Sequence, residues 1–139
     1  MKLRIKLVSN LATVPTRGSD NAAALDLYAA QAMYIPAMSH AVVELGVAVE
    51  IPEGYFGLVA QRSGLASRGC DIFGGIIDSD YRGTIKAFIF NGGTERLCVN
   101  VGHRVAQLVI LPCMKCEVEK CDELTETKRG ENGLGSTGL

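Results

Sequence analysis

Short strand-like segments, each bounded by turn residues, restrict the fold of this chain more than any other feature. Residues 3–7, 47–51 and 97–101 alternate large apolar side chains with small, polar or charged ones. This is the period of a strand with one buried face. Glycine, proline, asparagine and aspartate fill the gaps between the segments, as turns require.

Three further segments, 55–60, 85–90 and 105–111, are mostly apolar over the length of a strand, which predicts strands buried on both faces. Many short strands at close spacing predict an all-β domain of the jelly-roll or distorted-barrel type. We expect one short helix over 63–68, capped by its first serine and stopped by the glycine that follows it.

The composition excludes several classes of partner. The chain has 139 residues, of which 47% are hydrophobic and 21% charged, and a net charge of −1. This length suits a single domain, and the charge balance offers no broad basic surface for nucleic acid. No apolar run is long enough to span a membrane. The N-terminus alternates charge and hydrophobe, unlike a signal peptide.

The five cysteines, without a secretory signal, predict free thiols in a reducing compartment. We therefore expect a cytoplasmic protein, with a nuclear location also open, and not a secreted one. Cys113 and Cys116 form a C-x-x-C pair near Cys121. A structural zinc needs four ligands, usually as two spaced pairs, and no second pair is present.

The glycine-rich end, residues 129–139, has the composition of a polyphosphate grip. Its four glycines let backbone N–H groups approach an anion, and an arginine and a Ser-Thr pair add further donors. No lysine follows the glycines, which excludes a P-loop. A disordered terminus is the alternative. The charged segment before it predicts two parts, a β core over 1–114 and a C-terminal arm over 115–139, long enough to reach a neighbouring subunit.

The segment 74–83, Gly-Gly-Ile-Ile-Asp-Ser-Asp-Tyr-Arg-Gly, is a second candidate site. Asp78 and Asp80 are separated by one residue, so both point to one face of a strand or hairpin. An EF-hand would need an acidic residue or amide where Arg82 stands, which excludes calcium of that type. Ordinary turn chemistry is the alternative, but the apolar residues before Asp78 favour a carboxylate that orients a water.

Three weaker candidates remain. Arg62–Ala66, Arg-Ser-Gly-Leu-Ala, offers a cation, a hydroxyl and backbone donors to an anion, or is a capped turn. Asp26 lies in an apolar run, where a buried carboxylate needs a partner unless it sits in a surface turn. Gln107 lies in an apolar strand, where a structural glutamine is the alternative.

Taken in order, five segments of this chain resemble the five motifs of the trimeric dUTPases. These segments are 23–27, 62–66, 75–83, 102–108 and 129–138. The resemblance implies a jelly-roll protomer and a homotrimer with three active sites at subunit interfaces. It also implies hydrolysis of dUTP to dUMP and pyrophosphate with Mg²⁺.

The resemblance implies roles for residues around the phosphates. Asp78 matches the carboxylate that orients and deprotonates the attacking water. The residues matched to phosphate contacts are Arg62, Ser63, Gly64, Arg129, Ser136 and Thr137. Asp26 and Gln107 match positions that hold water around the metal or the phosphates, so that Mg²⁺ is held mainly by the triphosphate.

Other matched residues would recognise the nucleoside. The hairpin residues are Ile72, Gly75, Ile76, Ile77 and Lys86, with Lys86 acting through its main chain. Uracil presents an N3–H donor and an O4 acceptor, and a site committed to that pattern rejects cytosine. Tyr81 matches the residue against deoxyribose, and Leu134 and Gly135 match the part of the arm that covers uracil.

Four positions depart from the family pattern: a glycine is Ala24, a proline is Gln61, an acidic residue is His103, and the arm's aromatic residue is Leu134. These departures keep open a non-catalytic, dUTPase-like protein that binds nucleotide and signals to a partner. A dCTP deaminase is the other alternative, but Phe88 stands where that family has its catalytic glutamate.

Overall fold

The computed structural model describes residues 1–133, and antiparallel strands make up most of the body. The strands are β1 (Arg4–Leu7), β2 (Thr16–Arg17), β3 (Leu25–Tyr28), β4 (Met33–Ile35), β5 (Ser39–Glu50), β6 (Tyr55–Ala60), β7 (Cys70–Phe73), β8 (Ile76–Ile77), β9 (Thr84–Asn91), β10 (Leu97–Val99) and β11 (Arg104–Pro112). In this part of the chain the only helix is α1 (Ser63–Ala66). The predicted all-β class is confirmed.

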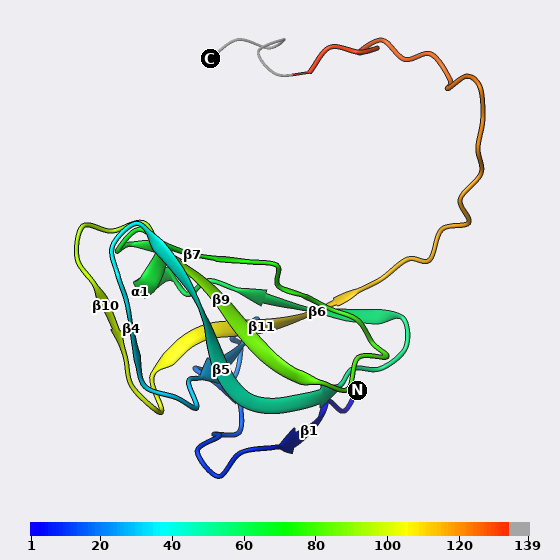
Figure 1. Ribbon diagram of the computed structural model, residues 1–139. Coiled ribbons are helices and arrows are strands. Elements are labelled where there is room, and N and C mark those ends of the chain that lie inside the picture. The colour runs from blue at the N-terminus through cyan, green and yellow to red at the C-terminus, as the bar shows by residue number, and fades with distance from the viewer. Residues whose placement is uncertain (134–139) are drawn as a thin grey trace.

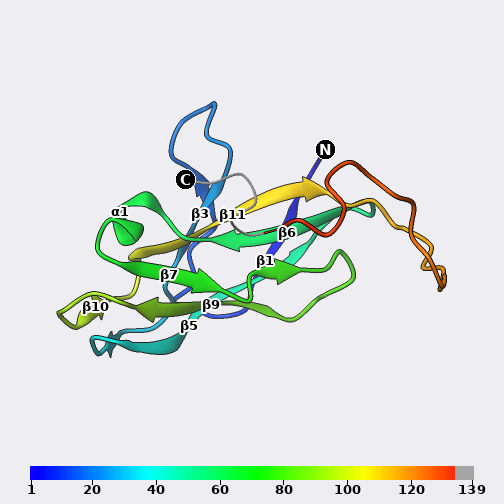
Figure 2. The same cartoon turned by 90° about the horizontal axis from the view of Figure 1, so that it is seen from above.

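The strands form three sheets, of order β1-β5-β9-β7, β2-β3-β11-β6-β8 and β10-β4. All strand pairs are antiparallel. The two larger sheets pack against each other, and the small sheet lies at the end that also carries α1 (Figures 1 and 2).

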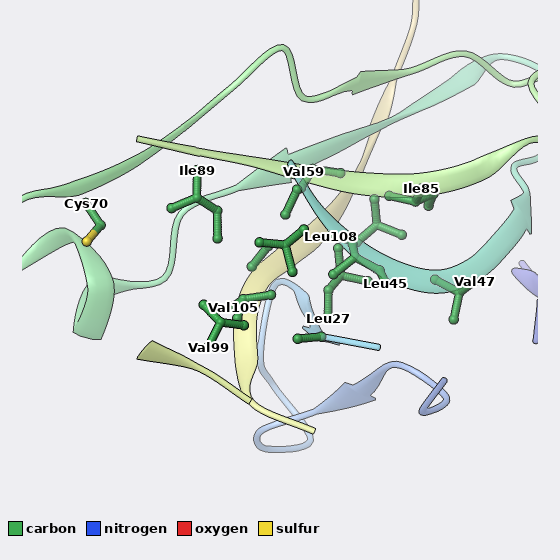
Figure 3. Packing of buried hydrophobic residues seen from close by; sticks show 14 of the residues in the cluster. Leu27, Leu45, Val47, Val59, Cys70, Ile85, Ile89, Val99, Val105 and Leu108 are labelled. Atoms are coloured by element: carbon green, nitrogen blue, oxygen red, sulfur yellow. The ribbon is translucent and has the colours of Figure 1, made fainter. Parts of the chain in front are cut away.

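The core lies between the two larger sheets, where alternate residues of each strand point inward (Figure 3). Those with less than 4% of their surface exposed include Leu27, Leu45, Val47, Val59, Ile85, Ile89, Val105 and Leu108. Each such side chain stabilises the fold by about 1.5–3 kcal/mol relative to exposure. The core therefore fixes the strand register on which the candidate site depends.

The prediction that three strands are buried on both faces is wrong for the single chain. Along β9 the residues alternate, with Ile85, Ala87 and Ile89 buried, Lys86 exposed and Phe88 half-buried. Within residues 1–133 no second layer covers the outer face of this sheet, so its apolar side chains stay partly exposed. A continuous apolar run can thus mark a strand with one fully buried face.

The helix differs from its prediction at the first residue. Arg62, with φ −89° and ψ 144°, is the N-cap, and no side-chain hydrogen bond caps the helix. Ser63 is therefore the first helical residue, not the cap. Gly69 has a φ of 78° in the turn after the helix, where its N–H donates to the Ala66 carbonyl.

Beyond β11 the described chain leaves the body (Figure 1). Residues 113–133 contain no strand or helix, and all of them are exposed. The Cys113 N–H donates to the Gly54 carbonyl at 2.8 Å, and Lys115 Nζ lies 3.0 Å from Glu53 Oε1. These contacts set the direction in which the segment departs. Over residues 1–133, no helix has the length and apolar character needed to cross a membrane.

Candidate active site

Strand register brings Asp26 and Gln107 together. Asp26 on β3 pairs with Gln107 on β11, and Gln107 pairs on its other side with Ala60 at the end of β6. The chain then turns, so that Arg62 lies beside the same row. Three segments far apart in sequence therefore meet at one end of this sheet.

Charge holds this cluster in place. Asp26 is buried, with 12% of its side chain exposed; its Oδ1 lies 2.8 Å from Arg62 Nε and its Oδ2 lies 3.4 Å from an Arg104 guanidinium nitrogen. Arg62 also donates to the Arg104 carbonyl at 3.2 Å. The Gln107 amide donates to the Gln61 carbonyl at 2.8 Å. The carboxylate thus fixes the guanidinium of Arg62 at the start of α1.

Ser63 and Gly64 occupy the first positions of α1, and both are exposed. The first N–H groups of a helix have no partner within it. Together with Arg62, these residues present donors and a positive charge on one surface. The structure therefore brings five predicted residues into this cluster: Asp26, Arg62, Ser63, Gly64 and Gln107.

A second cluster surrounds Asp78 in the loop that follows β8. Ile77 pairs with Gly57 of β6, and Asp78 comes next, exposed at the strand's end. The Tyr81 hydroxyl donates to the Thr84 carbonyl at 3.2 Å. Arg82 donates to the Ser79 carbonyl at 2.7 Å. These bonds hold the loop closed with Asp78 at its first position.

A hollow of about 210 Å³ opens between β8 and the start of β9. Among the residues that line it are Ile76, Ile77, Asp78, Tyr81 and Lys86. The Lys86 ammonium lies 2.8 Å from Glu44, and this hydrogen bond raises the pKa of Lys86 above its ordinary 10.5. The hollow is therefore bounded by a carboxylate, a phenol and apolar strand residues.

Two predicted hairpin residues do not line this hollow. Ile72 on β7 pairs with Ile89 on β9 and packs against the core. The Gly75 carbonyl accepts from the Val59 N–H at 2.7 Å, and a Cβ on Gly75 would lie 2.1 Å from the Val59 oxygen. Gly75 thus locks β8 onto β6, a positioning role.

Asp78 also borders a wider hollow, of about 650 Å³, on its other side. Glu50, Glu53, Asp80 and Lys115 line it together with Asp78. The segment that departs after β11 therefore begins beside the Asp78 loop. The four carboxylates that line this hollow make it a poor site for a polyphosphate without added cations.

The two clusters lie at opposite ends of β6 in the single chain. Asp78 follows Ile77, which pairs with Gly57 near the start of β6, whereas Arg62 lies beyond Ala60 at the end of that strand. Roughly 15 Å of extended strand therefore separates the two clusters. Figure 1 shows α1 at one end of the body and the start of β9, next to the Asp78 loop, at the other. One chain therefore does not bring Asp78 to the phosphate-contact candidates.

Arg129 lies in the exposed segment, where its Nε donates to the Asn132 carbonyl at 2.9 Å. Leu134, Gly135, Ser136 and Thr137 lie outside the described residues. Over residues 1–133, no three histidine, cysteine or acidic side chains gather as a metal centre. Sequence reasoning missed Arg104, whose only signal was its place in the Gly102–Leu108 segment.

Two facing antiparallel sheets closed at one end by a small third sheet define an all-β jelly roll. A family profile described as dUTPase matches residues 10–138. The chain therefore belongs to the dUTPase family.

Individual relatives are similar over the full length of this chain. The deoxyuridine 5'-triphosphate nucleotidohydrolase of Yarrowia lipolytica is 43% identical, over 100% of this chain and 90% of that protein. The mitochondrial enzyme of Homo sapiens is 45% identical, over 99% of this chain and 55% of that longer protein. The solved dUTPase of Staphylococcus bacteriophage 80alpha with dUPNHPP has a TM-score of 0.89 at 32% identity, with 99% of each chain covered.

Proposed function

We propose that this chain is a dUTP diphosphatase, which hydrolyses dUTP to dUMP and pyrophosphate. The proposal is carried by one observation, the position of Asp78 at the rim of a small hollow beside Tyr81. Membership of the dUTPase family supports it, because its relatives are named for this reaction.

Asp78 serves as the general base. It accepts a proton from a water molecule whose oxygen bonds to the α-phosphorus of dUTP. The bond between that phosphorus and the oxygen leading to the β-phosphate breaks, and pyrophosphate leaves. Asp78 is exposed at the loop's first position, so a water can reach its carboxylate.

Mg²⁺ fits this site as an ion held mainly by the triphosphate. It offsets phosphate charge when bound. Both Asp26 oxygens already accept from arginines, but a carboxylate has further lone pairs for a metal-bound water. Gln107 keeps its carbonyl oxygen for the same use. A related dUTPase from phage phi11 of S. aureus, 28% identical, is described with a structural Mg(II) ion.

Phosphate binding falls to Arg62, Ser63 and Gly64. The Asp26 carboxylate holds the Arg62 guanidinium, so little freedom is lost when it binds an anion. Arg129, Ser136 and Thr137 would grip the terminal phosphates when the segment over 115–139 closes as an arm. The core over 1–114 carries the other groups.

Uracil recognition falls to the hollow between β8 and β9. Backbone groups near Ile76 and Ile77 would pair with the N3–H and O4 of uracil, and the reversed pattern of cytosine would leave them unpaired. Tyr81 would cover the deoxyribose and leave no room for a 2′-hydroxyl. The adjacent Ile72, Gly75 and Lys86 act by shaping the hairpin backbone.

The separation of Asp78 from Arg62 supports a site shared between chains. A homotrimer in which the Asp78 loop of one subunit meets the Arg62 cluster of the next would complete it. Leu134 and Gly135 would then cover the base as part of an arm. The five free thiols favour a reducing compartment such as the cytoplasm.

The test is pyrophosphate release from dUTP with Mg²⁺, by the unmodified protein and by Asp78→Asn. We expect the substitution to lower kcat by about 10²–10⁴-fold, the usual contribution of a general base. An unmodified protein that binds dUTP without releasing pyrophosphate is instead a nucleotide-binding module. Ammonia release from dCTP would indicate deamination, which Phe88 disfavours.

Mixed assemblies test the shared site. Asp78→Asn and Arg62→Gln proteins are each unfolded, mixed in equal amounts and refolded together. If Asp78 and Arg62 act from different chains, about one quarter of the sites regain both residues. Refolding each variant alone is the control. Mixtures no more active than the separate variants contradict the shared site.

A further inference from the structure

A basic hollow of about 340 Å³ lies between α1 and the corner that joins β10 to β11. Both α1 and β10 lie at the same end of the body (Figure 1). Its polar lining includes Arg62, Arg68, His103 and Arg104, and its walls include Leu65 and Val99. Ser63, Gly64 and Gln107 do not line it, so it is separate from most of the phosphate-contact cluster.

The charges in this hollow are not balanced. No carboxylate of the described chain lines it. Arg62 and Arg104 share the single carboxylate of Asp26, and the Arg68 guanidinium has no acceptor within residues 1–133. Three guanidinium groups against one carboxylate leave an excess of two positive charges. Such an excess, in a hollow with apolar walls, favours an anion with several negative charges.

His103 adds a donor to the hollow. The ring Nδ1 accepts the Asn100 backbone N–H at 3.2 Å, and the His103 backbone N–H donates to the Asn100 carbonyl at 3.0 Å. Because Nδ1 is an acceptor, the neutral ring carries its proton on Nε2. A carboxylate at this position would accept the same N–H but add a negative charge. The imidazole therefore preserves the turn and adds no negative charge to the lining.

We propose that this hollow is a second anion site, which takes inorganic pyrophosphate. The choice of pyrophosphate rests on the proposed function, in which this ion is the product. Arg62 belongs both to the phosphate contacts and to the hollow, so a leaving diphosphate can pass from one to the other. The hollow, of about 340 Å³, has space for several water molecules, which a bound diphosphate would displace. Planar guanidinium forks match phosphate oxygens two at a time.

The test is calorimetric titration of the full chain with sodium pyrophosphate, with and without saturating dUpNHpp, a nucleotide that fills the substrate site. With the analogue bound we expect one pyrophosphate per chain, in the hollow; without it we expect two, because the empty substrate site also takes the ion. Arg68→Gln and His103→Asp should each weaken this binding by about tenfold or more, because each removes a donor or adds a like charge. Both residues are exposed, so both variants should fold and keep their dUTP turnover.

Arg4→Gln is the matched control, since Arg4 is an exposed arginine on β1 that pairs with Glu50. It should leave pyrophosphate affinity unchanged. An orthophosphate titration separates a diphosphate site from a general anion site, and equal affinities would overturn the assignment to pyrophosphate. Loss of all pyrophosphate binding on addition of dUpNHpp, or unchanged affinity in Arg68→Gln, would remove the site altogether. Turnover of dUTP, measured in the same samples, tests the proposed function separately.

Discussion

The Tyr81 ring lies directly over the backbone of Gly83. A Cβ on Gly83 would stand 2.3 Å from the Tyr81 hydroxyl oxygen and 2.4 Å from the ring carbon that bears it. The ring is held there by the bond from its hydroxyl to the Thr84 carbonyl. The glycine is therefore what allows Tyr81 to fold back over the loop that carries Asp78.

Gly83→Ala should displace the Tyr81 ring and leave the fold intact, because the clash is with the far end of a side chain. We expect the preference for dUTP over UTP to fall by about tenfold, the value of one lost contact in a specificity site. The measurement is kcat/KM for both nucleotides. Gly18→Ala is the control, since nothing lies within 4 Å of a Cβ there. Unchanged discrimination in Gly83→Ala would contradict a role for the ring.

Asp26→Asn should weaken both stability and nucleotide binding. The amide cannot balance the charges of Arg62 and Arg104, so we expect a loss of about 1–3 kcal/mol in the free energy of unfolding. The KM for dUTP should rise as Arg62 loses its orientation. Urea unfolding and steady-state kinetics measure the two effects. Glu50→Gln, in an exposed pair with Arg4, should cost less than about 0.5 kcal/mol.

Removal of Mg²⁺ with EDTA should abolish dUTP turnover without changing the melting temperature of the nucleotide-free protein. Within residues 1–133 no cluster of three metal-ligating side chains exists for an ion to stabilise. Calorimetric scans with and without EDTA give the comparison. A lower melting temperature in EDTA would mean that a metal supports the fold itself.

Cys70 should make the fold less stable at alkaline pH. Burial raises the pKa of this thiol above its ordinary value of 9.0, and Arg68 opposes the shift. The unfolded chain therefore loses the proton first, and stability falls as pH rises through 9.0 toward the folded pKa. Between about pH 8 and about pH 10, the free energy of unfolding measured in urea should fall less for Cys70→Ser than for the unmodified protein. Equal losses would assign the effect to other groups.

Leu134→Phe should tighten binding of dUpNHpp about fivefold. An aromatic side chain at this position would stack on uracil, a contact worth about 1 kcal/mol beyond burial. Titration of both proteins with the analogue measures the change. Leu134→Met, also unbranched at Cβ and apolar, should bind as the unmodified protein does. Equal affinity for the phenylalanine variant would show that this residue does not cover the base.

Several strands could be predicted from sequence: β1 because charged and apolar residues alternate along it, and β6, β9 and β11 because they are apolar runs of strand length. The two-residue strands β2 and β8 could not, since two residues give too little pattern. The candidate residues were found through motif resemblance. Their division into two clusters depends on the register of β6 against β8 and β11, which no local pattern encodes.

The length of β6 has a consequence for how activity depends on concentration. A lone chain carries both halves of the proposed machinery but holds them a strand's length apart. Mass action then governs catalysis: dilution below the dissociation constant of the assembly should abolish activity while every chain stays folded.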